Sequence, residues 1–138
     1  MDERTKTMSA TEQGQDAPQE LRVSKDRKLL TVRFGDSEAY TLEAELLRVC
    51  SPSAEVQGHG PGQAITVYGK REVGIMTIDP VGHYAIRITF DDMHNSGIFS
   101  WSFLRELGRE RDTRWADYLA DLDTKGLSRD PVRPVRRN

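Results

Sequence analysis

Two carboxylates and an imidazole stand together in the stretch Asp91-Asp92-Met93-His94, directly after an alternating apolar segment. Side chains at the end of a strand can converge on a ligand, because the sheet holds their backbone rigidly. A carboxylate beside a histidine could tune a general base or bind a divalent ion. The alternative is a polar turn whose aspartates accept hydrogen bonds from backbone amides, since Asp favours turns. Asp91, Asp92 and His94 are therefore candidate ligand-binding residues, and His94 is also a candidate metal ligand.

A second candidate is the glycine-rich stretch Gly58-His59-Gly60-Pro61-Gly62. It lacks the lysine and hydroxyl residue of a nucleotide-binding loop and the spacing of a dinucleotide fingerprint, which excludes both phosphate cradles. Glycine lets a backbone approach a ligand closely, and it equally permits a purely structural turn. His59 and Gly60 are thus candidate ligand contacts, with a structural loop as the alternative.

Cys50 is the only cysteine, which excludes an intramolecular disulfide and a cysteine-built zinc or iron-sulfur site within one chain. It follows the apolar face of a predicted helix, so we expect a small buried side chain. A reactive thiolate would need a basic neighbour or a helix N-terminus, whereas Cys50 lies at a predicted C-terminus. Nothing in the sequence marks another nucleophile to pair with His94, which argues against a hydrolase built on Asp92 and His94.

The elements that position these residues follow from the apolar pattern. Alternation and turn signals predict strands over residues 28–34, 39–41, 73–78, 83–90 and 98–101. Helical spacing predicts helices over residues 42–49, 101–107 and 113–122. We expect Thr41 to cap the first helix, Gly108 to end the second, and Pro80-Val81-Gly82 to form the turn of an antiparallel pair.

Because the strands cluster in the middle of the chain, we predict an α+β fold with a small, mainly antiparallel sheet and short flanking helices. Trp101 shares a helical face with Leu104 and Leu107. That spacing favours core packing, and Trp101 is also kept as a candidate ligand contact.

The ends of the chain are poor in large apolar residues and predict disorder. Residues 1–24 are expected to form a disordered arm, residues 25–123 the folded domain with its C-terminal helix, and residues 124–138 a disordered basic tail. The tail concentrates basic residues, so the central part is more acidic than the net charge of -2 indicates. An acidic domain argues against nucleic acid as the main partner.

The composition, 36% hydrophobic and 30% charged, fits a soluble protein. No apolar run approaches the roughly 18 to 20 residues of a membrane-spanning helix. The polar N-terminus lacks the apolar stretch of a secretory signal, so we expect a cytoplasmic location and no membrane contact.

Several motifs in order carry a family resemblance: LRVCSPSAEV at residues 47–56, VGI at 73–75, VGHYAI at 81–86 and DDMHNSGIFSW at 91–101. With these motifs, about residues 28–107 resemble the gamma-butyrobetaine hydroxylase-like N-terminal domain family, long described as a domain of unknown function. Residues 51–70 are similar to its short, stand-alone bacterial branch.

The resemblance implies a fold but not an activity. In the hydroxylase this domain precedes an oxygenase domain that holds iron and 2-oxoglutarate, and it binds zinc through three cysteines and a histidine. The resemblance places Ser51, Ser53 and Val56 where the thiolates stand and His94 at the histidine, with Cys50 one position early. Hydroxyls and valine cannot hold such a zinc, so we expect no cofactor and a hydrogen-bonding role for His94. Residues 108–138 are also too few for the oxygenase domain.

Three functions remain open. We favour a non-catalytic module that binds a protein or a small ligand; related domains appended to iron-sulfur carrier ATPases suggest an accessory role in metal-cofactor handling. The second is a mononuclear metal-binding protein that uses His94 with Asp91, Asp92 or His59. The third is an enzyme, disfavoured because the sequence shows neither a nucleophile nor an oxyanion donor pair.

Overall fold

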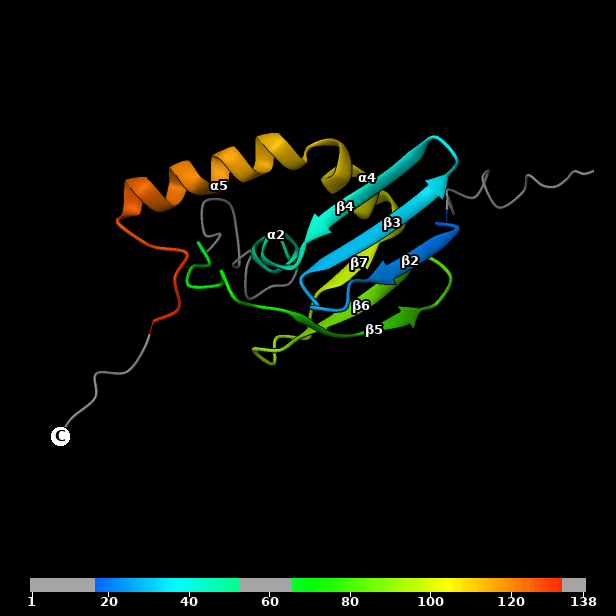
Figure 1. The fold of residues 1–138 in the computed structure, drawn as a ribbon, viewed down its shortest axis with the longest axis horizontal. Coiled ribbons are helices and arrows are strands. Elements are labelled where there is room, and N and C mark those ends of the chain that lie inside the picture. The colour runs from blue at the N-terminus through cyan, green and yellow to red at the C-terminus, as the bar shows by residue number, and fades with distance from the viewer. Residues whose placement is uncertain (1–16, 53–65, 133–138) are drawn as a thin grey trace, which may run out of the picture.

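The structure, a computed structural model, describes residues 17–52 and 66–132. These residues form two three-stranded antiparallel sheets and their helices (Figure 1). The first sheet contains β2 (Glu20–Val23), β3 (Leu29–Gly35) and β4 (Glu38–Glu43). The second contains β5 (Ile75–Val81), β6 (Ala85–Phe90) and β7 (Ile98–Ser100). The helices are α2 (Ala44–Val49), α4 (Trp101–Arg109) and α5 (Arg111–Lys125). The predicted α+β class is confirmed.

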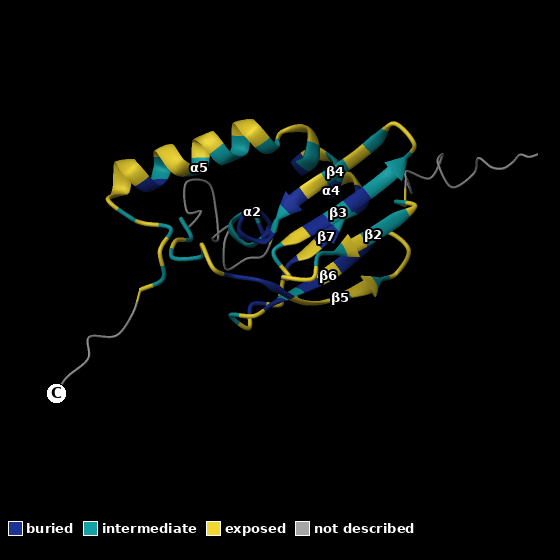
Figure 2. Cartoon of the chain, in the orientation of Figure 1, coloured by how far each residue is buried: buried dark blue, intermediate teal, exposed yellow. Residues whose placement is uncertain are grey.

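The core lies between the two sheets and under α2 and α4. Leu30 and Val32 point inward from β3, while Ile86, Ile88 and Phe90 point inward from β6, and all belong to one buried cluster. The period-two pattern of these strands produces the single apolar face that each sheet needs. Figure 2 shows this burial in the central strands and α2, whereas α5 is mostly exposed.

The β3–β4 hairpin is longer than predicted, and α2 begins later. Leu42 was expected in the helix but pairs with Leu30 in the sheet and is completely buried. Glu43, not Thr41, takes the N-cap position and makes no side-chain capping bond. Cross-strand packing of Leu42 therefore outweighs the capping preference of Thr41.

The predicted antiparallel pair of β5 and β6 is present, but its turn, residues 82–84, begins later than the predicted Pro80-Val81-Gly82 and shares only Gly82 with it. Pro80 pairs with Ile86 inside β5. Proline is tolerated there because β5 is an edge strand, whose outward N–H groups need no ladder partner. Gly82 has φ 55° and starts the turn.

Gly108 lies within α4 and does not end it; the C-cap is Glu110. A Cβ at Gly108 would stand 2.2 Å from Cγ of Tyr40, so the glycine serves the contact between α4 and β4. α5 runs longer than predicted and ends at Gly126, whose left-handed φ of 66° forms the C-cap.

Both predicted disordered ends contain ordered residues near the domain. Strand β2 lies within the expected arm, residues 1–24. It is ordered because Leu21 and Val23 pack against the core. At the other end, residues 127–132 return to the domain, and Ser128 accepts a backbone hydrogen bond from Gly69. The remaining predicted arm and tail, residues 1–16 and 133–138, lie outside the described residues.

Within the described ranges, no helix combines the length and apolar character required to cross a membrane.

Candidate functional site

The strand exit that carries the sequence candidates is a tight turn, residues 91–97, hereafter the Met93 turn. Phe90 N–H donates to the carbonyl of His94 at 2.9 Å, and Met93 N–H donates to that of Phe90 at 2.9 Å. These bonds place Met93 at the tip, with 70% of its surface exposed and a φ of 74°. A non-glycine residue in this left-handed region is uncommon and costs conformational energy.

Asp92 anchors the turn to two other segments. Its Oδ2 accepts from Arg48 Nε of α2 at 2.9 Å and from Lys70 Nζ at 2.5 Å, while Oδ1 accepts from the His94 amide at 3.2 Å. Burial opposes ionisation, but the hydrogen bonds from Lys70, the His94 amide and Arg48 outweigh it and lower the pKa of Asp92 to about 2. Asp92 is therefore a charged anchor at neutral pH and too weak a base for general-base work.

His94 is buried beside Ser51. Its Nε2 lies 3.0 Å from Ser51 Oγ, and the two residues are 7% and 0% exposed. A Cβ at Gly97 would stand 2.1 Å from the same Oγ, so only glycine fits there. The contact resembles a serine-histidine pair, but with Ser51 completely buried no substrate reaches its hydroxyl.

Asp91 and Trp101 do not join this pair. The Asp91 amide donates to the carbonyl of Gly74 at 2.9 Å, and the residue is exposed. Trp101 lies at the opposite end of β6, where its indole N–H donates to the carbonyl of His83 at 2.8 Å, which is a core-packing role. His59, Gly60, Ser53 and Val56 lie outside the described residues.

The described residues do not form a set of donor side chains that could bind a metal ion. Within residues 17–52 and 66–132, no three His, Cys, Asp or Glu side chains gather as metal ligands would. The Asp92 carboxylate is committed to two cations, and His94 Nε2 faces a hydroxyl. The described residues thus do not fit the zinc of the hydroxylase.

Three residues of this region were not singled out from the sequence: Arg27, Arg48 and Lys70. Arg27 lies on the neighbouring loop with a φ of 66°, and its carbonyl accepts from the Ile75 amide at 2.8 Å. Gly74 separates this loop from the Met93 turn, since its Cβ would lie 3.3 Å from Arg27 O and 3.1 Å from Asp91 Oδ2. Among the described residues, Arg27 and Met93 are the non-glycine residues with positive φ, and their two loops approach each other at Gly74. No local sequence signal marks them, because they come from separate segments.

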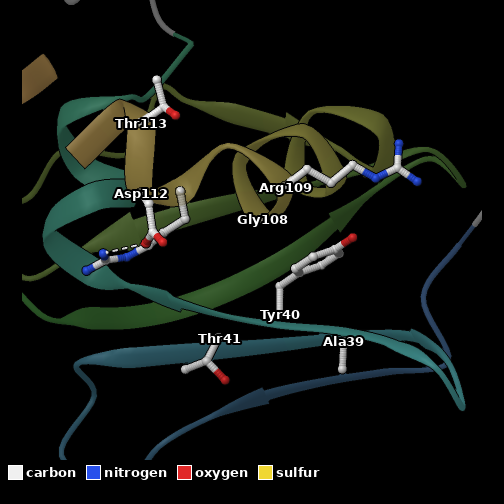
Figure 3. A pocket seen from close by; sticks show the side chains of 8 residues that line it. Ala39, Tyr40, Thr41, Gly108, Arg109, Asp112 and Thr113 are labelled. Carbon is white, nitrogen blue, oxygen red and sulfur yellow. Dashed lines mark hydrogen bonds and ion pairs between the residues drawn. The ribbon is translucent and has the colours of Figure 1, made fainter. Parts of the chain in front are cut away.

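Hollows on the described surface also lie away from the Met93 turn, and two of them border titratable side chains. The first, about 280 Å³, runs between β4 and the α4–α5 junction (Figure 3). The Arg111 guanidinium beside it already binds Glu43 and Asp112, so its charge is neutralised. The second, about 480 Å³, is open and lies beside Cys50 and Tyr118. Burial raises the pKa of Cys50 and raises that of Tyr118 to about 12, so neither side chain ionises readily.

A family model described as gamma-butyrobetaine hydroxylase-like, N-terminal, matches residues 21–105. The chain belongs to this family. Its sequence resemblance, expected over about residues 28–107, is confirmed, and the match reaches into β2. The comparison with curated proteins gives no match.

Solved structures support membership in the gamma-butyrobetaine hydroxylase-like family. One protein studied by NMR in solution is 48% identical, with a TM-score of 0.73 over 88% of this chain and 95% of its own. A second, also from NMR, is 35% identical, with a TM-score of 0.70 over 100% of this chain and 97% of its own. A crystal structure from Acidithiobacillus ferrooxidans ATCC 23270 is 35% identical, with a TM-score of 0.55 over 68% and 94%. It is described as a protein of unknown function of the DUF971 family.

Proposed function

We propose that this gamma-butyrobetaine hydroxylase-like domain is a non-catalytic protein-binding module, and that the Met93 turn is its contact surface. The observation that carries the proposal is Met93 itself, a large apolar side chain that is 70% exposed in a strained left-handed conformation. Strain of this kind persists where the surrounding structure imposes it, and it gathers at binding sites. Methionine also adapts well to the surface of a partner.

The turn is held in advance of binding. Asp92 ties it to Arg48 and Lys70, and Ser51 contacts His94 from within. A rigid contact residue loses little conformational entropy on association, which favours affinity. The polar network of the turn thus supports a scaffolding role for the residues that the sequence offered as chemistry.

The same contacts argue against an enzyme. Asp92 is ionised and paired, and the hydroxyl of Ser51 is buried. Catalysis would need a reachable nucleophile beside a base with a pKa near the working pH. An accessory role in metal-cofactor handling belongs to the same proposal on the family resemblance alone. A cytoplasmic location belongs to it on the polar N-terminal sequence.

The metal-binding alternative would depend on residues beyond the described ranges, His59 among them. Elemental analysis of untagged protein tests it directly. Stoichiometric metal in the wild type that is lost in His94→Ala would favour this alternative over the binding module.

The binding module is tested by co-purification from the native cells, with the untagged wild type and two variants compared. Met93→Asn removes the apolar side chain and tolerates the left-handed φ, so folding is preserved. Tyr84→Asn is the matched control, because Tyr84 is 56% exposed in the turn at the opposite end of β6. We expect a companion that the wild type and Tyr84→Asn retain and that Met93→Asn loses. Equal retention by all three, or no companion at all, would contradict the proposal.

A further inference from the structure

The C-terminal segment, residues 127–132, runs along one end of the domain and lies beside residues 69–71, as Figure 1 shows in red against green. Gly69 N–H donates to Ser128 O at 2.9 Å, and Arg71 N–H donates to Arg129 O at 2.8 Å. We call residues 127–132 the C-terminal strap. The two bonds come from the residues on either side of Lys70, so the strap holds the backbone that carries this lysine.

Arg129 fixes the strap to the core. Its guanidinium makes two hydrogen bonds to the Glu45 carboxylate, at 2.9 and 2.7 Å, and lies 4.9 Å from the centre of the Trp115 ring. Glu45 is only 6% exposed, so its charge needs this partner. A two-point bond to a buried carboxylate also fixes the orientation of the guanidinium, because its planar fork matches the carboxylate in one geometry.

Lys70 links the strap to the Met93 turn through an ion pair with Asp92. Its Nζ lies 2.5 Å from Asp92 Oδ2, and the same carboxylate accepts the His94 amide through Oδ1. A continuous series of contacts therefore runs from Glu45 through Arg129, the backbone of residues 69–71 and the Lys70 side chain to Asp92 and His94. Each step joins segments that are distant in sequence.

We propose that Arg129 is a positioning residue for the Met93 turn, and that release of the C-terminal strap loosens this turn through Lys70. The inference rests on the proposed function in taking the turn as the contact surface. A partner or modification that frees the strap would thereby lower affinity at a surface that it does not touch.

Amide hydrogen exchange measured by NMR on the full chain tests the coupling. The readout is the His94 amide, bonded to Asp92, and the internal reference is the Trp101 amide, bonded to Tyr84 O at 3.0 Å at the other end of β6. In Arg129→Ala we expect exchange at His94 to rise about tenfold or more, with little change at Trp101. Lys70→Ala should give the same pattern, and adding it to Arg129→Ala should give little further rise.

Arg71→Ala is the matched control within the same contact. It removes an exposed ion pair to Asp130, with side chains 45% and 65% exposed, and keeps the backbone N–H that binds the strap. Exchange at His94 should stay at the wild-type rate in this variant. Arg129→Ala could unfold because Glu45 is left unpaired. In that case the double variant Glu45→Met, Arg129→Met removes both charges and still lacks the ion pair that holds the strap.

The inference would be overturned by a folded variant that lacks the Arg129–Glu45 ion pair and whose His94 amide exchanges at the wild-type rate. Equal acceleration at His94 and Trp101 would also overturn it, since this would report a global loss of stability. Neither result depends on a companion protein. Failure of the proposed function appears instead as companion binding that survives Met93→Asn, so the two failures are distinguishable.

Discussion

At the scale of single residues, Asp92 shows how a carboxylate that looks catalytic becomes structural. Two cations and a backbone amide satisfy its oxygens, and the ion pairs are largely shielded, with side chains only 12% to 24% exposed. Charge-assisted bonds of this kind fix a turn more firmly than neutral ones. The anchor explains how the exposed Met93 beside it is held in a strained conformation.

The Asp92 anchor predicts a pH dependence. Its pKa in the folded protein is about 2, below the usual 3.8, so its stabilisation is present above about pH 5 and is lost as the pH falls toward 2. Allowing for solvent screening, we expect Asp92→Asn to lower the free energy of unfolding by about 1 kcal/mol at pH 7. Urea unfolding between pH 7 and 2 should show this difference shrinking with acid. A difference that is constant with pH would contradict the assignment.

Met93 is expected to trade stability for binding. Replacing it with Asn, which tolerates a positive φ, should raise the free energy of unfolding by about 0.5 to 1 kcal/mol. Thermal or urea unfolding measures the change, with Tyr84→Asn as the control. A loss of stability in Met93→Asn would mean that the side chain is structural, against the role proposed for it.

The single thiol should react slowly. Burial raises the pKa of Cys50, although Arg114 opposes this in part. With an aromatic disulfide reagent at pH 8, the folded protein should react at least about tenfold more slowly than free cysteine. Denaturant should restore the free rate. Cys50 is only partly buried, and reaction as fast as free cysteine in the folded state would contradict the expected protection.

At the scale of elements, contact between α4 and β4 depends on a missing side chain. The Tyr40 ring occupies the space where a Cβ of Gly108 would be, and Tyr40 Oη donates to Glu38 at 2.7 Å. Figure 3 shows the ring beneath the end of α4. A helix-weakening glycine is retained here because close packing outweighs helix propensity.

This contact predicts a reversal of sign. Gly108→Ala should destabilise the wild type by about 1 to 3 kcal/mol through overpacking. In a Tyr40→Ala background, the same change should stabilise by about 0.5 to 1 kcal/mol, since only helix propensity is left. A double-mutant cycle by urea unfolding measures both. If Gly108→Ala stabilised both backgrounds, the packing explanation would fail.

At the scale of the whole molecule, the domain recruits both neighbouring chain segments. β2 completes the first sheet, and the C-terminal strap closes over Glu45 and residues 69–71. The Met93 turn is thus supported by α2, Lys70 and, through Lys70, the strap. A small domain gains from such additions because little of its surface is otherwise buried.

Strand β2 should therefore contribute to global stability. Leu21 packs on the core and pairs with Val32, so Leu21→Ala should lower the free energy of unfolding by about 1 to 2 kcal/mol. Arg22→Ala, at an exposed position of the same strand, should change it by less than about 0.5 kcal/mol. Equal effects of the two substitutions on the free energy of unfolding would contradict a contribution of β2 to the core.

The sequence by itself determined the α+β class, the central strands and the helix around Trp101 and Leu104. These follow from the local spacing of apolar residues, which can be read from the order of residues without knowing the fold. The family was also evident, because ordered motifs survive in the sequence. Asp92 and His94 were placed at a strand exit for the same reason.

Only the tertiary structure decided what those residues do. Arg48, Lys70 and Ser51 meet the Met93 turn from 22 to 44 positions away along the chain, and no local pattern encodes such meetings. β2 and the strap were missed because their order comes from partners in the folded core, namely Val32, Glu45 and Trp115. Local propensity assigns an element only when its stabilising contacts are also local, and at both chain ends these contacts are long-range.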